Sequence, residues 1–262
     1  MKERGFVLLA VLWVLVVAGA LALAAGAEAR LTTQATANRV ALTRARWAAE
    51  ACLAIAEERG SQDSVALGGE ISCSVRVEDV GSRYPLARLD STRWTRLLKA
   101  VGVFRLRADT LGGRLAAAQH AGRLEHVEQL ADRAWLTVTE QELLSEVVTA
   151  DGPGTVNVNA APLPVLVALP GLGNRAAQAF LRRRERGPPI RELSDVLADL
   201  HAAARDSLLA AYADLVALTT TRTTLIRLDA RGWVGSRNPG VTLEVFAVPT
   251  AERLAIVGRR LR

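Results

Sequence analysis

The sequence predicts an α+β fold, in which a long N-terminal helix packs on a small antiparallel sheet and a helical domain is inserted between the strands. Three features lead to this prediction. A helical pattern extends from about residue 6 to residue 58. Segments in which apolar and polar residues alternate occur near residue 71 and again after residue 219. The stretch between them has the spacing of several helices.

The composition limits the possible functions but does not identify one. The 262 residues leave room for one large or two small domains after the N-terminal segment. Apolar residues make up 50% of the chain and aromatic residues only 4%, so we expect a mostly aliphatic core. The net charge of +6 permits contact with nucleic acid, anionic lipid or an acidic protein surface.

The N-terminal helix is predicted to span a membrane. Phe6 to Ala27 contains no charged side chain, and its 22 residues rise roughly 33 Å as a helix, which is enough to cross a bilayer. A signal peptide has a shorter apolar region, although Ala25-Gly26-Ala27 offers small residues for cleavage. Lys2 and Arg4 precede the span, so the N-terminus is expected in the cytoplasm.

The junction of the basic head with the apolar helix resembles the leader of type IV prepilins and pseudopilins. The head ends in Gly5, Phe6 follows, and the apolar run begins at once. The resemblance implies that a prepilin peptidase cuts between Gly5 and Phe6, that the new amine of Phe6 is methylated, and that the helix is retained. The helix would then serve as a membrane anchor and as the packing core of a filament.

One departure from the pilin pattern indicates which branch of the family the chain resembles. Most members carry Glu as the fifth residue of the mature chain, where this chain has Ala10. A carboxylate within an apolar span costs about 2 to 3 kcal/mol and normally marks a function. The members that characteristically lack it are the K-type minor pseudopilins of type II secretion (GspK family). The resemblance implies a position at the tip of the pseudopilus, where the chain has no earlier subunit to dock onto.

Ala29 to Glu58 is predicted to continue the helix and to pack on a globular part. One face is expected to be buried, and its residues are Val40, Trp47, Ala48, Cys52 and Ile55. Gly60 and its polar neighbours end the helix.

Residues 71–77 alternate as in a half-buried strand, and Glu78-Asp79 then resembles the acidic pair that ends this strand in the family. Cys52 and Cys73 are the only cysteines. Outside the cytoplasm they can form a disulfide between the helix and the strand, and two buried free thiols are the alternative.

The stretch from Thr92 to Glu146 is predicted to be mainly helical, with breaks at Gly102, Gly112-Gly113 and Gly122. The expected buried face of its first helix is formed by Trp94, Leu97, Leu98, Val101 and Phe104. K-type pseudopilins have a helical insertion here with an acidic loop that binds calcium. The acidic residues of this chain are scattered and lack the ligand spacing of a calcium loop, so neither calcium nor another cofactor is expected.

Residues 155–162 resemble the Asn-x-Asn-x-Ala signature of the family through Asn157 and Asn159. Asn159 is predicted to be the N-cap of a helix over Leu163 to Leu169. Pro170, Gly171 and Gly173 then form a helix-hairpin-helix pattern, in which glycine permits a tight turn and a close backbone approach.

The hairpin permits two interpretations. The following helix begins where it can hold a phosphate and carries four arginines that suit DNA, Arg182, Arg183, Arg184 and Arg186. A DNA-uptake pilin that binds DNA through this unit is therefore the alternative function. A single hairpin is weak evidence for DNA binding, and the family uses the unit for protein packing, so nucleic acid is the less favoured partner.

The C-terminal part predicts a helix over Asp206 to Ala217 and strands over 219–229, 241–248 and 253–261, with a turn at 235–240. The predicted organisation is a leader at 1–5, a transmembrane helix at 6–27, a helix extension with the first strand at 28–91, an inserted helical domain of the helix-hairpin-helix or SAM-like type at 92–205, and the remaining strands at 206–262.

No motif in the sequence supports catalysis. The three histidines are not part of an HExxH motif, and neither a nucleophile elbow nor a Walker loop occurs. The chain thus resembles a K-type minor pseudopilin, which implies a structural protein without enzymatic activity. An unrelated single-pass periplasmic protein is the other alternative. The resemblance implies a bacterial inner-membrane location with a periplasmic C-terminal part. The implied partners are the I-type and J-type minor pseudopilins, the major pseudopilin and the prepilin peptidase.

Overall fold

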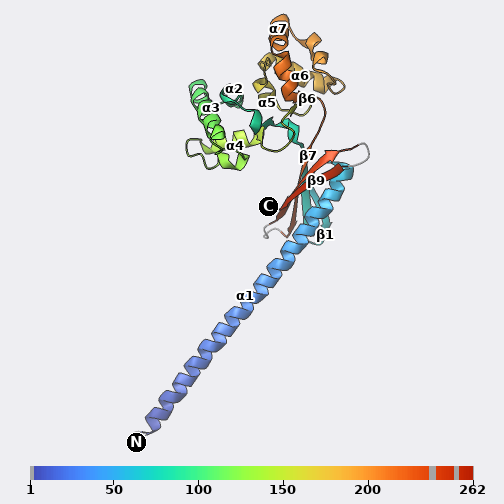
Figure 1. The fold of residues 1–262 in the computed structure, drawn as a ribbon. Coiled ribbons are helices and arrows are strands. Elements are labelled where there is room, and N and C mark those ends of the chain that lie inside the picture. Colours follow the sequence, from blue (N-terminus) through green and yellow to red (C-terminus); the bar gives the residue numbers. More distant parts are fainter. Residues whose placement is uncertain (1–2, 236–239, 251–253, 262) are drawn as a thin grey trace. The chain divides into compact units, whose positions relative to one another are not determined.

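The structure is a computed structural model that describes residues 3–235, 240–250 and 254–261, and only the backbone of residues 3–10. The chain divides into two compact units. The first comprises residues 1–76, 229–244 and 260–262, and the second comprises 77–228 and 245–259. The predicted α+β class is confirmed, since a long helix, a five-stranded antiparallel sheet and a set of shorter helices are all present (Figure 1). The predicted limits of an inserted domain at residues 92 and 205 stay a prediction.

The first unit begins with helix α1, Glu3–Arg59. Its C-terminal half is rich in Ala, Leu, Arg and Glu, which favour helix. The hydroxyls of Thr32, Thr33 and Thr36 donate to carbonyls four residues earlier, so these polar side chains are satisfied within the helix. The helix ends where Gly60 adopts a φ of 71° and donates its N–H to the carbonyl of Ala56 at 2.9 Å.

The sheet has the strand order β1-β2-β7-β8-β9. Its strands are β1 Gln62–Gly68, β2 Ile71–Asp79, β7 Ile226–Val234, β8 Val241–Pro249 and β9 Leu254–Leu261. β1 and β2 form an antiparallel hairpin. β2 and β7 also run antiparallel, because Val80 N–H bonds the carbonyl of Leu225 and Gly235 N–H bonds that of Glu70. The predicted turn at 235–240 lies largely outside the described residues, since 236–239 are not described.

Helix α1 packs on the sheet through small residues. The buried face consists of alanines and one cysteine: Ala45, Ala48, Ala49, Cys52 and Ala56. A Cβ added to Gly232 of β7 would lie 2.6 Å from the N atom of Ala49, so helix and strand are in close backbone contact. The predicted burial of Val40 and Trp47 is wrong, since they are 46% and 67% exposed. Bulky side chains do not fit where the helix approaches the strand this closely.

The second unit contains the shorter helices and their shared core. The helices are α2 Ser91–Ala100, α3 Arg105–His120, α4 Val138–Val147, α5 Leu163–Ala168, α6 Asn174–Arg186, α7 Ala202–Ala210 and α8 Tyr212–Leu218. The described part of this unit also contains short 3₁₀ helices: η1 Val80–Ser82 and η2 Leu86–Arg88 precede α2, η3 Val127–Leu130 follows α3, and η4 Leu193–Asp199 follows α6. Two parallel strand pairs, β3 Tyr84–Pro85 with β4 Val148–Thr149 and β5 Val156–Asn157 with β6 Thr219–Thr220, join distant segments.

The first helices of this unit follow the predicted pattern with two differences. Trp94, Leu97 and Leu98 are fully buried, whereas Phe104 is 72% exposed, so its predicted burial is wrong. Phe104 precedes α3 as its N-cap residue and therefore lies off the buried face of α2. The predicted break at Gly112 does not occur, because this glycine lies within α3. A Cβ there would lie 3.0 Å from the carbonyl oxygen of Ser91, so the glycine permits α2 and α3 to pack closely.

The predicted strand over 219–229 is displaced along the chain. The structure forms the two-residue strand β6 and begins β7 only at Ile226. Residues between them make side-chain and backbone contacts to other segments: Thr223 donates to Asp79 and the carbonyl of Thr221 accepts from Asn159. These long-range hydrogen bonds replace the strand pairing that the threonine-rich composition favours.

Candidate functional site

A buried polar network gathers the signature asparagine and an acidic strand end. Asn157 is 2% exposed. Its amide donates to Asp79 Oδ2 at 2.6 Å, and its carbonyl oxygen accepts from the N–H of Asn159 at 3.0 Å. Asp79 also accepts from Thr223 Oγ1 at 2.7 Å and from the N–H of Gly81 at 2.8 Å. The carboxylate therefore joins three segments of the second unit: residues 79–81, 157–159 and 223.

Asn159 has a different role from the predicted helix cap. Its amide donates to the carbonyls of Ile190 and Thr221 at 2.8 and 2.9 Å, and its oxygen accepts from the N–H of Ile190 at 2.9 Å. The N-cap of α5 is Pro162, without a side-chain hydrogen bond. The N-cap prediction is therefore wrong, because a turn at residues 157–161 separates Asn159 from the helix, and its side chain satisfies two distant backbone segments instead.

Glu78, the neighbour of Asp79, forms an ion-pair cluster. It accepts from Arg83 Nε at 2.7 Å and from Arg227 Nη2 at 2.6 Å, and all three side chains are less than a fifth exposed. Arg83 also donates to the carbonyl of Ser145 at 2.9 Å. The acidic pair thus holds two sets of partners, and nothing in the sequence alone links it to the asparagines. The acidic pair at the strand end was the available signal.

The hairpin turn is packed against the chain itself. Gly171 has a φ of 73°, which a residue with a side chain rarely adopts. A Cβ there would lie 2.8 Å from the carbonyl oxygen of Ser207 and 2.9 Å from the Cβ of Ala211. Gly173 is the N-cap of α6 and would meet nothing within 4 Å. The close backbone approach that was predicted for the hairpin therefore occurs at Gly171, which lies against α7 of the same unit. Pro170 lies in the turn beside it.

The arginines of α6 differ in what they contact. Arg184 donates to the carbonyls of Val158 and Ala161 at 3.2 and 2.6 Å, and its partial burial lowers the pKa of its guanidinium. It therefore holds the signature segment and is not available for a phosphate. Arg182 and Arg186 are exposed.

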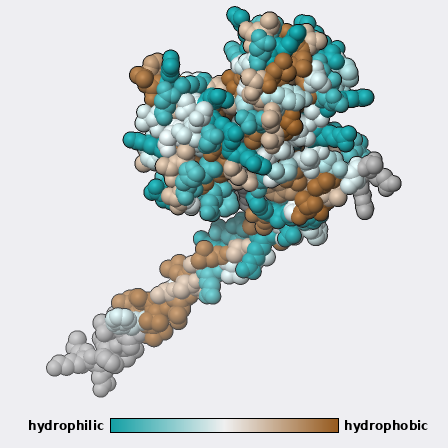
Figure 2. Space-filling model, turned by 45° about the horizontal axis from the view of Figure 1, so that its top comes forward, coloured by the Kyte–Doolittle hydropathy of each residue, from teal (hydrophilic) through white to brown (hydrophobic). Residues whose placement is uncertain are grey.

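Helix α1 has the length and composition of a membrane span. Among the described residues it is the one helix that meets these criteria, with a mean hydropathy of 2.1 in its most apolar window and no burial there. Figure 2 shows apolar side chains where the described side chains of this helix begin and more polar ones further along. Gly5, Phe6 and Ala10 belong to the helical backbone, but their side chains lie outside the described residues.

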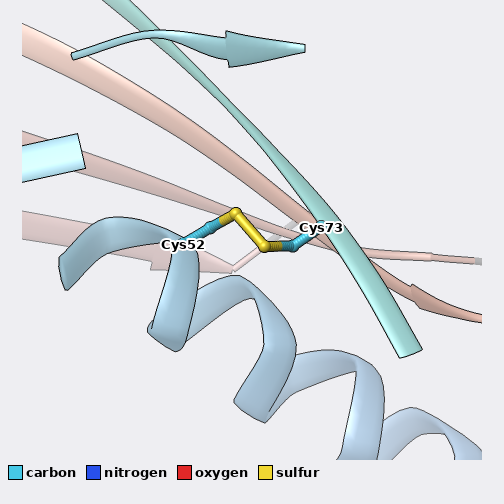
Figure 3. The surroundings of a disulfide bond; sticks show 2 residues. All are labelled: Cys52 and Cys73. Carbon is cyan, nitrogen blue, oxygen red and sulfur yellow. A yellow bond between two sulfur atoms is a disulfide. The ribbon is translucent and has the colours of Figure 1, made fainter. Parts of the chain in front are cut away.

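The two cysteines are joined by a disulfide. Cys52 of α1 and Cys73 of β2 have a Cα–Cα distance of 6.1 Å (Figure 3). Both residues are fully buried in the first unit, so the bond links the helix to the sheet in the core.

No metal centre emerges from the part of the chain that the structure describes, where no group of three or more His, Cys, Asp and Glu side chains is suited to hold an ion. Asp109 instead accepts from Lys99 at 2.6 Å on the surface of the helical unit. That the chain needs no cofactor stays a prediction.

Two comparisons with known proteins connect this site to a family. Residues 156–218 match the family model of type II secretion system protein K. This range contains both signature asparagines, the hairpin and helices α5 to α8. The chain also resembles a chain in the crystal structure of the GspK-GspI-GspJ complex from enterotoxigenic Escherichia coli. The TM-score is 0.59 with 12% sequence identity, over 90% of this chain and 99% of the other. No curated protein sequence matches. These findings confirm the resemblance to K-type minor pseudopilins.

Proposed function

From the resemblance to protein K of type II secretion systems, we propose that this chain is a minor pseudopilin at the tip of the pseudopilus. It joins I-type and J-type minor pseudopilins, initiates pseudopilus assembly and so supports protein export across the outer membrane. It acts by shape and packing and catalyses no reaction. The observation that carries the proposal is the family match over residues 156–218, because it falls on the Asn157 network and the hairpin.

The proposed location is the bacterial inner membrane, with the folded part in the periplasm. The apolar half of α1 supports an anchor by its length and composition. The buried disulfide supports an oxidising compartment, because disulfides persist outside the cytoplasm. Processing between Gly5 and Phe6 and methylation of Phe6 belong to the same proposal.

A groove on α1 is the proposed contact with a neighbouring pseudopilin. It lies in the first unit and has a volume of about 590 Å³. Most of its lining is small or apolar (Thr32, Thr33, Thr36, Ala37, Val40, Ala41 and Val234), and Arg44 adds a positive charge. Val40 is almost half exposed, and Trp47, two helical turns further on, is exposed on the same side. Small residues let a second helix approach closely, so the groove fits the helix of an I-type or J-type partner.

The first experiment is mass spectrometry of the mature N-terminus, on protein purified from native membranes. We expect a chain that begins at N-methylated Phe6. A chain that begins near Glu28, or is intact from Met1, would contradict the pseudopilin pathway.

Photo-crosslinking tests the partner contact. We expect benzoylphenylalanine at Val40 to form a cross-link to an I-type or J-type pseudopilin in secreting cells. The matched control is benzoylphenylalanine at Glu58, which is also exposed on α1 but lies outside the groove. Equal cross-linking at both positions would contradict the groove as the contact. A cross-link to DNA-associated proteins only, with salt-dependent DNA binding by the purified chain, would favour the DNA-uptake alternative.

A further inference from the structure

A pocket on helix α6 has no role in the Asn157 network or in the groove on α1. Three arginines line it, Arg182, Arg183 and Arg186, together with Ala179 and the carboxylate-bearing Asp199 of η4. Its volume is about 250 Å³, which is room for a small group and its hydration. Arg186 lies four residues after Arg182 and three after Arg183, and both spacings make side chains neighbours on a helix surface.

The three guanidinium groups form no close pair in the described part of the chain, although the charge of Arg183 acts on Asp195 at longer range. Among the described residues, none of them forms a side-chain hydrogen bond or ion pair, in contrast to Arg184, which donates to two carbonyls. The Nε of Arg183 is buried and lacks a hydrogen-bond partner there. A buried donor without an acceptor costs free energy, and an acceptor bound in the pocket would remove that cost.

We propose that the pocket binds a single oxyanion, either the carboxylate of an acidic protein segment or a phosphate. Guanidinium groups donate paired N–H bonds that match the two oxygens of such a group. One anionic group fits better than a polyanion, because two acidic side chains of η4 are close to the arginines: Asp199 is part of the lining, and Asp195 interacts electrostatically with Arg183. A nucleic acid strand would meet repulsion from these carboxylates. The site is independent of the proposed function and goes beyond it.

Titration calorimetry on the full chain in detergent tests the proposal with two probes. One is inorganic phosphate, and the other is the peptide acetyl-Gly-Glu-Gly-amide, which carries one carboxylate. We expect saturable binding of at least one probe. Arg186→Gln should weaken binding about fivefold to tenfold, since it removes a charge-assisted hydrogen bond. Asp199→Asn should strengthen it, because a repelling carboxylate is lost.

The matched control is Arg175→Gln, an exposed arginine on the same helix outside the pocket, which should leave binding unchanged. Arg186 is exposed, so its replacement is not expected to unfold the chain, and circular dichroism checks this.

Binding of the peptide alone would assign an acidic protein segment as the ligand, and binding of phosphate alone would assign a free anion. The proposal is overturned if neither probe saturates, or if Arg175→Gln weakens binding as much as Arg186→Gln. It is also overturned if only oligonucleotides bind, with an affinity that rises with their length.

Discussion

Asn157 donates its side-chain amide to the carboxylate of Asp79 over 2.6 Å, although the two residues lie 78 positions apart. The carboxylate has further donors in Thr223 and the N–H of Gly81, so an acidic group at the end of β2 ties together the segments that begin and end the helical part of the second unit. A Cβ at Gly81 would lie 3.0 Å from the Cβ of Asn157, so a larger residue at position 81 would crowd this contact. This contact explains physically why an asparagine occupies the first signature position.

Replacement of Asn157 is expected to destabilise the protein. Asn157→Ala removes the amide donor to Asp79 and the acceptor for Asn159 N–H, both in a buried setting. We expect a loss of about 2 to 3 kcal/mol, because buried polar partners are left unsatisfied. At about 2 to 4 °C per kcal/mol, thermal unfolding followed by near-UV circular dichroism measures this as a lower Tm. Asn174→Ala, at an exposed position, should change Tm little; equal shifts would contradict a structural role of the network.

The two glycines of the hairpin should respond differently to the same substitution. Gly171→Ala forces a side chain into a left-handed backbone and against Ser207 and Ala211, so we expect a loss of about 2 to 4 kcal/mol. Gly173→Ala meets nothing within 4 Å and has a φ of −84°, so its cost should stay within about 1 kcal/mol. Thermal unfolding of both variants decides the matter. A harmless Gly171→Ala would show that the turn does not pack on α7 as the structure has it.

Loss of the disulfide should weaken the first unit. The bond between Cys52 and Cys73 closes a loop with a sequence separation of 21, for which chain entropy predicts a stabilisation of about 3 kcal/mol. The double variant C52A/C73A should therefore melt at a lower temperature than the oxidised chain. Reducing agent should lower the Tm of the native chain and leave that of the double variant unchanged. A native chain whose mass shows two free thiols would contradict the bond.

The Arg107–Glu140 ion pair predicts a loss of stability in acid. The hydrogen bond from Arg107 is the main reason why the pKa of Glu140 falls from 4.5 to about 2. A carboxyl with a lowered pKa stabilises the folded state above its unfolded pKa, so this contribution is complete above about pH 4.5 and is lost as the pH falls toward 2. Glu140→Gln should flatten the dependence of Tm on pH in this window. Glu142→Gln, at an exposed position of the same helix, should leave the pH dependence of Tm unchanged.

Features that depend on neighbours along the chain were predictable from the sequence. The composition of residues 6–58 predicted a long helix, and α1 extends over Glu3–Arg59. The alternation at residues 71–77 predicted a strand, which is part of β2. The predicted helix over Leu163 to Leu169 corresponds to α5, and the glycine pattern predicted a tight turn at Gly171. Local propensity and periodicity determine such elements, because the atoms involved are close in sequence.

Contacts between distant segments were decided by the tertiary structure. Sequence periodicity places Trp47 on the buried face of the N-terminal helix, but the close approach of Gly232 leaves room only for small side chains there. It made Asn159 a helix cap, whereas the docking of residues 190 and 221 gives its side chain three hydrogen bonds. Sequence periodicity fixes the direction of a side chain within its own element, and only packing determines which element it meets.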